Sequence, residues 1–519
     1  MIRLTRRVLF RLLSRYIWLW MLVMFSLAGC STMFVPQPCA LDTDCGSGLV
    51  CALRDRAPVC VHAEDDPLVI GMSAPVSGTN QALGTGMKLG IELAFKEKNA
   101  DGGIRGRLLK LEFRDDAYVP ELAEAAARTL VDVKPVIAAP RCPTTTTPAV
   151  AGQMPISSTA LERGPNAVLA FIGNVGTPTM IRAAPVAIET GTIFFGAFTG
   201  AATILRDDRA ASCKSFIFNV RASYVQEARA TMEFFKKRSI PDYKHLISFD
   251  QDDSFGQAGY DGLVQAYKEV IGPFPGGANP NTPIARYRYT RNEDTSVPAQ
   301  VQLATAYLAS SNVLNTGGTE LHHVGIMMTT TYGAGAAFIK ALRDWQFAND
   351  VQQQSLNKAN RLKLYFSNVS FVGPNALSDN LVEAGMVSTP GGAMPYTQSV
   401  VVSQVVPNYQ NDSSDVVTAY NRLIAAGGHT PGFTSLEGYV SARVFIAGLA
   451  SHAGPFRPDT LVQTFERLPD LSLGIGASSG FSRTNHQYSN SVWGTTIEPD
   501  GSFKNLYFWS AGQPIQFFE

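Results

Sequence analysis

The stretch "VIGMSAPVSGTNQALG" (Val69 to Gly84) joins a buried strand to a helix. Apolar residues run up to Pro75, and the small polar turn "SGTN" (77–80) leads into an amphipathic segment. A helix that begins beside the end of a strand offers free backbone N–H groups, which suit an anionic ligand. The stretch therefore predicts one wall of a ligand cleft.

Strand and helix patterns alternate from Leu68 onward. Apolar runs predict strands, and apolar positions three or four residues apart predict the helices between them. The predicted strands are 68–73, 108–113, 135–139, 192–198, 245–249, 285–289, 324–328 and 364–368. Such alternation is typical of α/β folds, and about eight strands are many for one open sheet, so we expect two doubly wound parallel-sheet lobes. The Pro- and Gly-rich segments 272–283 and 389–395 are predicted to be linkers or surface loops.

The overall composition is that of a globular protein. Of the 519 residues, 45% are apolar and 17% are charged. Lysine plus arginine and aspartate plus glutamate each number 43, so no basic excess points to nucleic acid.

The first 29 residues predict a secretion signal. A basic leader precedes the apolar segment Tyr16 to Gly29, which is shorter than the ~18 residues of a membrane span. "LAGC" (27–30) resembles the lipobox of bacterial lipoproteins, in which the cysteine is diacylated. We therefore predict lipidation of Cys30 and export to the periplasmic face of a bacterial membrane, inner or outer. The alternative is an ordinary signal anchor in which the cysteine occurs by chance.

The remaining cysteines fall into two groups. Four lie close together in a segment rich in Asp, Gly and Ser: Cys39, Cys45, Cys51 and Cys60. An even, dense set in an exported segment predicts two disulfides, with all three pairings open. A zinc site is the alternative, but the spacing contains no Cys-x-x-Cys pair. Cys142 and Cys213 either pair with each other or stay buried as small apolar groups.

Small polar and aromatic residues follow most of the predicted strands. They lie in "RCPTTTTPA" (141–149), "GAFTGA" (196–201), "DQDDSFG" (250–256), "TTTYGAG" (329–335) and "NVSFVG" (368–373). Ligands of open α/β sheets bind beyond the carboxyl ends of the strands. A single threonine at a helix start is also an ordinary N-cap, so it is the repetition at several strand ends that indicates a ligand site.

The segment "IGMSAPVSGTNQALGTGMKLGIELAFKEKNADGGIRGRLLKLEFRDDA" (70–117) resembles the start of type I periplasmic binding proteins of the Leu/Ile/Val-binding kind. It has their Pro-x-Ser-Gly turn, their Asn-x-x-Gly-Gly-Ile-x-Gly turn at 99–106, and a strand ending in Asp115 and Asp116. The resemblance runs from about Leu68 to the C-terminus. It implies two lobes joined by three crossover strands and closing around a small ligand, with no catalysis, cofactor or metal.

The resemblance also implies a division of the chain and a set of partners. We expect a signal peptide at 1–29 and a lipid anchor with a Cys-rich linker module at 30–66. The N-terminal lobe would comprise 67–218 and about 404–484, and the C-terminal lobe 219–403 and about 485–519. No P-loop is present, so an ABC permease and a separate ATPase would complete an importer.

Ligand contacts implied by the resemblance come from both lobes. They are Ser77, Gly78, Leu83, Thr144, Thr145, Phe198, Thr199, Gly200, Phe255, Tyr332 and Ser370. Ser370 stands near the position of the acidic residue that holds the amino group in the family. A buried unpaired ammonium is costly, so the ligand would differ from a standard branched-chain amino acid unless Asp252, Asp253 or Glu437 takes over. Arg221 is a further candidate, either for an anionic group of the ligand or for a hinge salt bridge.

Two other functions are consistent with parts of the sequence. A ligand sensor or protein-contact lipoprotein of the same fold would use the Cys-rich segment as a contact stalk and not as a passive spacer. A serine hydrolase is suggested by "GASSG" (476–480), which matches Gly-x-Ser-x-Gly. The residues after it, "FSRTNH" (481–486), do not have the pattern of the helix that a nucleophile elbow needs.

Overall fold

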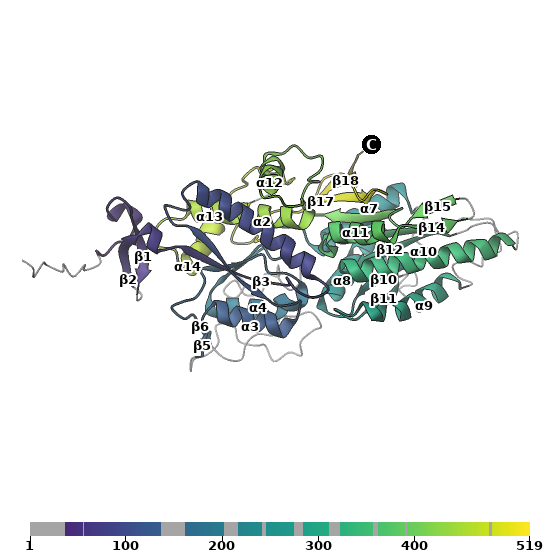
Figure 1. The fold of residues 1–519 in the computed structure, drawn as a ribbon, viewed down its shortest axis with the longest axis horizontal. Coiled ribbons are helices and arrows are strands. Elements are labelled where there is room, and N and C mark those ends of the chain that lie inside the picture. Colours follow the sequence, from purple (N-terminus) through teal and green to yellow (C-terminus); the bar gives the residue numbers. More distant parts are fainter. Residues whose placement is uncertain are drawn as a thin grey trace, which may run out of the picture.

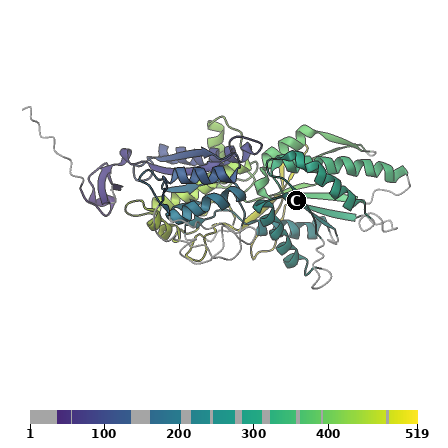
Figure 2. The same ribbon diagram turned by 90° about the horizontal axis from the view of Figure 1, so that it is seen from below.

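The computed structural model describes residues 37–54, 57–135, 161–201, 216–240, 245–274, 284–310, 322–355, 362–389, 392–476 and 480–518. Figure 1 shows an elongated molecule in which a small N-terminal hairpin and two α/β lobes follow one another along the longest axis, and Figure 2 shows the same order from below. Within these ranges, no helix combines the length and the apolar character that a membrane crossing requires.

Lobe 1 is built on a parallel sheet of five strands in the order β4-β3-β7-β8-β9. The strands are β3 (Leu68–Ala74), β4 (Leu109–Asp115), β7 (Ala170–Ile172), β8 (Ile193–Phe195) and β9 (Ile217–Phe218). Helices α2 (Gln81–Ala100) and α13 (Phe433–Ser451) lie on one side of the sheet, and α3 (Pro120–Leu130) and α4 (Thr177–Thr190) lie on the other (Figure 1). Two more helices, α12 (Asp415–Ala426) and α14 (Pro458–Phe465), complete the lobe. Helices on both faces explain why the inner strands are apolar throughout.

Helices α2 and α13 lie in backbone contact although they are far apart in the sequence. A Cβ atom on Gly90 would lie 1.9 Å from the carbonyl oxygen of Ser435, and one on Gly438 would lie 2.4 Å from that of Met87. Any larger residue at either glycine would therefore push the two helices apart.

Lobe 2 has a mixed sheet of eight strands in the order β11-β10-β12-β13-β16-β17-β18-β19. The parallel part comprises β10 (Leu246–Gln251), β11 (Ile284–Tyr289), β12 (His322–Thr329), β13 (Leu362–Asn368) and β16 (Val400–Gln404). The antiparallel part comprises β17 (Ser491–Ile497), β18 (Phe503–Ser510) and β19 (Gln516–Phe517). Its helices are α7 (Tyr224–Arg238), α8 (Ser254–Val270), α9 (Val297–Leu308), α10 (Tyr332–Ser355) and α11 (Pro374–Ala384).

The α/β architecture and the parallel core of each sheet confirm the sequence prediction, and two segments differ from it. Of the predicted strand 135–139 only Pro135 is among the described residues, and it ends β5 (Lys134–Pro135), which pairs in antiparallel fashion with β6 (Leu161–Glu162) in a separate two-stranded sheet. Segment 389–395 is not a plain linker but part of a hairpin of β14 (Met386–Thr389) and β15 (Gly392–Pro395). Most of 272–283 lies outside the described residues. The antiparallel strands of lobe 2 were not predicted from the sequence.

The chain passes between the lobes near residues 219, 405 and 488. Two of these crossovers run side by side, because the Tyr488 N–H donates to the Asn219 carbonyl (2.8 Å) and the Ser489 N–H donates to the Val220 carbonyl (2.9 Å). The third is tied to the antiparallel part of lobe 2, where the Asn408 amide donates to the Phe503 carbonyl (2.9 Å). Three connections of this kind form the expected hinge.

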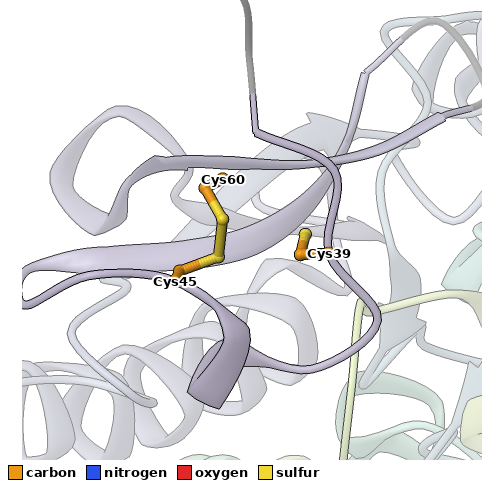
Figure 3. Close-up of side chains that lie close together, drawn as sticks. All are labelled: Cys39, Cys45 and Cys60. Atoms are coloured by element: carbon orange, nitrogen blue, oxygen red, sulfur yellow. A yellow bond between two sulfur atoms is a disulfide. The ribbon is translucent and has the colours of Figure 1, made fainter.

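The N-terminal module is a hairpin of β1 (Leu49–Arg54) and β2 (Ala57–His62) held by two disulfides. They join Cys39 to Cys51 and Cys45 to Cys60. The sulfur atoms of Cys39, Cys45 and Cys60 lie within 4.8 Å of one another (Figure 3), but each sulfur is bonded in a disulfide and offers no thiolate to a metal. The structure thus selects one of the three pairings. Cys30, Cys142 and Cys213 lie outside the described residues.

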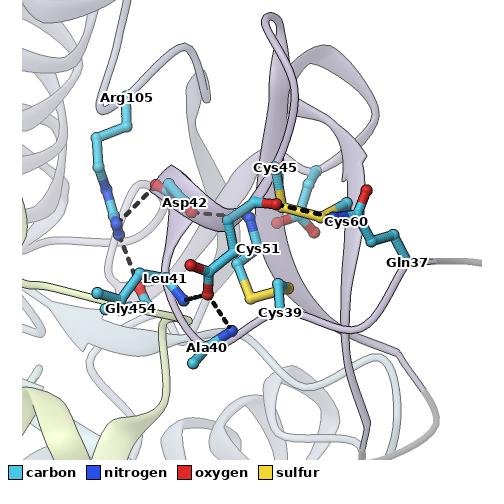
Figure 4. The surroundings of a disulfide bond; sticks show 12 residues. Gln37, Cys39, Ala40, Leu41, Asp42, Cys45, Cys51, Cys60, Arg105 and Gly454 are labelled. Carbon is cyan, nitrogen blue, oxygen red and sulfur yellow. Dashed lines mark hydrogen bonds and ion pairs between the residues drawn. A yellow bond between two sulfur atoms is a disulfide. The ribbon is translucent and has the colours of Figure 1, made fainter.

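The module is docked on lobe 1 by two arginines. Arg107 is fully buried, and it donates to the Cys51 carbonyl (2.9 Å) and to Asp66 (2.9 Å). Arg105 forms an ion pair with Asp42 (2.7 Å) and donates to the Gly454 carbonyl (3.0 Å), as Figure 4 shows. These contacts join the disulfide-bonded hairpin to two loops of lobe 1.

Candidate ligand site between the lobes

Aromatic side chains from both lobes pack together where the lobes meet. Phe371, which follows β13, lies at the centre, with ring centroids 4.9 Å from Phe198 and 6.1 Å from Tyr118 of lobe 1. Phe255, in the first turn of α8, lies 4.6 Å from Phe371. All four side chains are buried. The structure therefore places Phe198 and Phe255, which the sequence singled out, in one cluster with Phe371 and Tyr118, which it did not.

A chain of hydroxyl groups lies beside this cluster. The Thr199 hydroxyl is 2.7 Å from that of Thr177 and 3.3 Å from that of Tyr224. Thr177 begins α4, and no side chain caps the first turn of that helix, so the backbone N–H groups of Thr177 and Thr179 add donors at the same place, whereas Pro178 has none. At Gly200, a Cβ atom would lie 2.5 Å from the Tyr224 ring, so only glycine allows this approach.

The turn before α4 contributes a second kind of polar group. Both amide atoms of Asn174 are buried and have no hydrogen-bond partner among the described residues, and the residue is 2% exposed. A buried amide without partners is costly, so this turn has hydrogen-bonding capacity that a small polar molecule could satisfy. The Gly- and Thr-rich sequence "GNVGTPT" (173–179) that follows strand β7 was the signal for this turn, and the sequence interpretation passed over it in favour of 141–149.

Arg221 joins the two lobes through charged partners. Its guanidinium lies 2.6 Å from Glu227 of α7 and 3.2 Å from Glu437 of α13, and it donates a hydrogen bond to the Ser370 hydroxyl. Burial alone would lower the pKa of Arg221, but Glu437 and Glu227 outweigh burial and raise that pKa, so the group stays charged. Glu227 also accepts from the Ser370 N–H (2.7 Å) and the Ser403 hydroxyl (2.6 Å). The cluster is a buried ion-pair network that spans the hinge.

The other residues expected at the site are spread more widely. Ser77 and Gly78 are exposed, whereas Leu83 is buried. Leu83 faces lobe 2, because a Cβ atom on Gly373 would lie 2.8 Å from its side chain. The Tyr332 hydroxyl donates to the backbone carbonyl of Thr79. Thr144 and Thr145 lie outside the described residues, and so does Ser478 of the hydrolase motif, after which residues 480–490 contain no helix.

Asp116, which directly follows β4, is a buried carboxyl next to Tyr118 of the aromatic cluster. It accepts from the Ser73 hydroxyl (2.6 Å) and from the Tyr118 N–H (3.0 Å). Burial raises the pKa of Asp116 from 3.8 to about 6. In the described part of the chain, no basic side chain offsets the cost of burying the charged form.

This raised pKa predicts a stability that falls with rising pH. The folded protein binds the Asp116 proton more tightly than the unfolded chain, so the stabilisation is complete below about pH 4 and is lost as the pH rises through about 6. A pKa difference of this size corresponds to about 3 kcal/mol. We expect Asp116→Asn to match the wild type in free energy of unfolding at pH 4 and to exceed it at pH 8. Guanidinium denaturation at both pH values measures this, and equal stabilities at pH 8 would contradict it.

Comparisons with known proteins agree with this architecture. The sequence matches the periplasmic binding protein family over residues 67–154 and 163–502. It is 38% identical over 90 residues to an amino acid binding protein of Pseudomonas aeruginosa, an alignment of 17% of this chain and 24% of that one. The chain therefore spans about a quarter of the length of that curated relative.

Solved structures give the same result over most of the chain. A possible leucine/isoleucine/valine-binding protein from Rhodopirellula baltica SH 1 superposes with a TM-score of 0.63 at 26% identity, over 86% of this chain and 98% of that one. A leucine binding protein from Thermotoga maritima MSB8 has a TM-score of 0.59 at 14% identity, over 86% and 99%. The fold is that of type I periplasmic binding proteins. The chain thus belongs to the periplasmic binding protein family of the Leu/Ile/Val-binding kind, whose members bind ligands and are not enzymes.

Proposed function

We propose that this protein captures a small carboxylate or amide between its lobes and delivers it to an ABC importer, and that a lipid on Cys30 holds it at the periplasmic face of a membrane. The observation that carries the proposal is the Thr177–Thr199–Tyr224 hydroxyl chain at the start of α4, set beside aromatic rings from both lobes. Hydroxyl donors and a helix N-terminus suit a carboxylate, and aromatic rings suit an apolar or aromatic remainder.

The charge cluster narrows the proposed ligand class. The resemblance places near Ser370 the acidic residue that would hold the amino group of an amino acid. Here the Ser370 hydroxyl accepts from the guanidinium of Arg221, and Glu227 and Glu437 are both engaged by that same guanidinium. Arg221 therefore takes the place at Ser370 that a ligand ammonium would need, and it also binds both carboxylates that could replace the missing acidic residue. We infer that carboxylates and amides without an α-ammonium bind more tightly than α-amino acids.

A thermal-shift screen tests the proposal. The protein is unfolded and refolded to remove any solute that co-purifies, and its melting temperature is measured with amino acids, small carboxylates, amides and short peptides. A ligand at one hundred times its dissociation constant stabilises the folded state by about 2.7 kcal/mol, which is a clear shift. We expect the shift with carboxylates or amides. No shift across the panel would contradict small-solute capture.

A matched pair of variants locates the site. Thr199→Val removes one hydroxyl of the proposed site at nearly constant volume. We expect it to weaken binding of the shifting solute by tenfold or more, since a hydrogen bond to a charged group contributes about 1.5–3 kcal/mol. The control is Thr190→Val, which removes a buried hydroxyl at the far end of α4 and leaves the hydroxyl groups of the proposed site unchanged. Equal affinities of the two variants would place the ligand elsewhere.

A further inference from the structure

Two hydrogen bonds cross directly from lobe 1 to lobe 2 at the turn before α2. The Asn80 amide donates to the Asn292 side-chain oxygen (2.7 Å), and the Tyr332 hydroxyl donates to the Thr79 carbonyl. Thr79 and Asn80 belong to the "SGTN" turn that precedes α2 of lobe 1. Asn292 and Tyr332 follow strands β11 and β12 of lobe 2. The same turn that the sequence marked as one wall of a cleft is thus tied to the opposite lobe.

The lobe 2 side of this contact is held in an unusual backbone conformation. Asn292 has a φ angle of 60°, a left-handed conformation that side-chain-bearing residues rarely adopt and that asparagine tolerates best after glycine. Asn80 is only 4% exposed, whereas its neighbours Gly78 and Thr79 are exposed, and its amide is bound by the lobe 2 loop. The loop is therefore shaped to reach the other lobe.

This contact is also connected to the aromatic cluster. Arg291, the neighbour of Asn292, forms an ion pair with Asp253 (3.0 Å). Asp253 in turn accepts from the Phe255 N–H (2.8 Å) and from the Gln251 amide (2.6 Å). The loop that carries Asn292 is thereby linked through one carboxylate to the start of the helix that carries Phe255.

We propose that the Asn80–Asn292 and Tyr332–Thr79 hydrogen bonds form a latch that holds the lobes together in the ligand-free protein. This inference rests on the proposed function, because lobe closure is the step that encloses a ligand. The latch residues act as positioning residues that set the fraction of closed protein. A ligand that binds the closed state gains apparent affinity in proportion to that fraction.

The test uses the ligand-free protein and so needs no known ligand. The double variant Tyr332→Phe/Asn292→Gly deletes the phenolic hydroxyl and the amide, and glycine retains the left-handed conformation. The control is Tyr396→Phe, because the Tyr396 hydroxyl donates to Asp344 within lobe 2. Each protein is unfolded and refolded with its disulfides intact to remove bound solute. The radius of gyration is then measured by small-angle X-ray scattering, and folding is checked by circular dichroism.

We expect a larger radius of gyration for the double variant than for the wild type, and no change for the control. An unchanged radius in a folded double variant would overturn the latch. If the double variant does not fold, the radius of gyration of the single variant Tyr332→Phe tests the latch by the same criterion. If the radius of gyration increases but no solute raises the melting temperature in the thermal screen, the latch is retained and small-solute capture is rejected. The two proposals can therefore fail separately.

Discussion

Replacing Arg107 with methionine is expected to lower the free energy of unfolding by about 3 kcal/mol, because a fully buried guanidinium with two strong hydrogen bonds is removed. Methionine retains much of the apolar stem, so the loss reports on the charged group and not on packing. The Cys51 carbonyl is left without its donor, and the disulfide-bonded module loses its main tie to lobe 1. Guanidinium denaturation under non-reducing conditions measures the change.

The chain offers a close control for this experiment. Arg54 pairs with the same aspartate, Asp66 (2.9 Å), but its side chain is 46% exposed whereas that of Arg107 is 0% exposed. Exposed ion pairs contribute about 0–1 kcal/mol, so Arg54→Met should have little effect. Equal losses for the two variants would mean that burial of Arg107 does not anchor the module.

Replacing Arg221 with methionine should have a comparable or larger effect, with a loss of about 4 kcal/mol in the free energy of unfolding at pH 8. The substitution removes the cation shared by Glu227 and Glu437, whose side chains are 0% and 6% exposed. Two buried carboxylates would then repel each other. Chemical denaturation at several pH values measures the loss.

The pH dependence separates this cause from a packing defect. Without the cation, two buried carboxylates face each other with no opposite charge beside them, and burial favours the neutral form of a carboxyl group. The variant therefore regains stability as the pH falls and the carboxyls take up protons. The control is Arg229→Met on α7, the helix that carries Glu227, where the arginine pairs with Glu233 and Glu269 and is 44% exposed. A loss that stays constant between pH 8 and pH 5 would contradict the electrostatic explanation.

The sequence predicted the elements whose pattern is local. Strands β3, β10, β12 and β13 are mostly apolar because helices cover both faces of each sheet, and such segments stand out without any partner being known. Strand β17 pairs with β16, which lies about 90 residues earlier in the chain, and β18 joins the sheet only through its pairing with β17, so the place of both strands in the sheet depends on a partner that a local pattern does not show. The disulfide pairing was open for the same reason, because spacing alone permits three solutions.

The candidate site was predictable only in part. Phe198 and Phe255 follow strands directly, and the rule that ligands bind at strand ends is enough to select them. Phe371 follows Ser370 in a single turn of 3-10 helix, and nothing in the local sequence indicates which of the two faces the other lobe. The sequence left two roles open for Arg221, a contact for an anionic ligand group or a hinge salt bridge. Its partners Glu227 and Glu437 lie 6 and 216 positions away in the sequence. Contacts of this kind follow from tertiary packing.

The close contact between α2 and α13 constrains the order in which the protein can fold while it is being synthesised. Helix α2 is complete at residue 100, but the helix that covers it begins only at residue 433. Until then, the backbone of α2 at Met87 and Gly90 lacks the close contacts that Gly438 and Ser435 of α13 supply. Synthesis of lobe 1 therefore begins first, but lobe 1 cannot complete its fold before most of lobe 2 has left the ribosome. Throughout that interval the incomplete chain exposes an apolar face of α2. Chaperones bind exposed apolar surfaces of this kind.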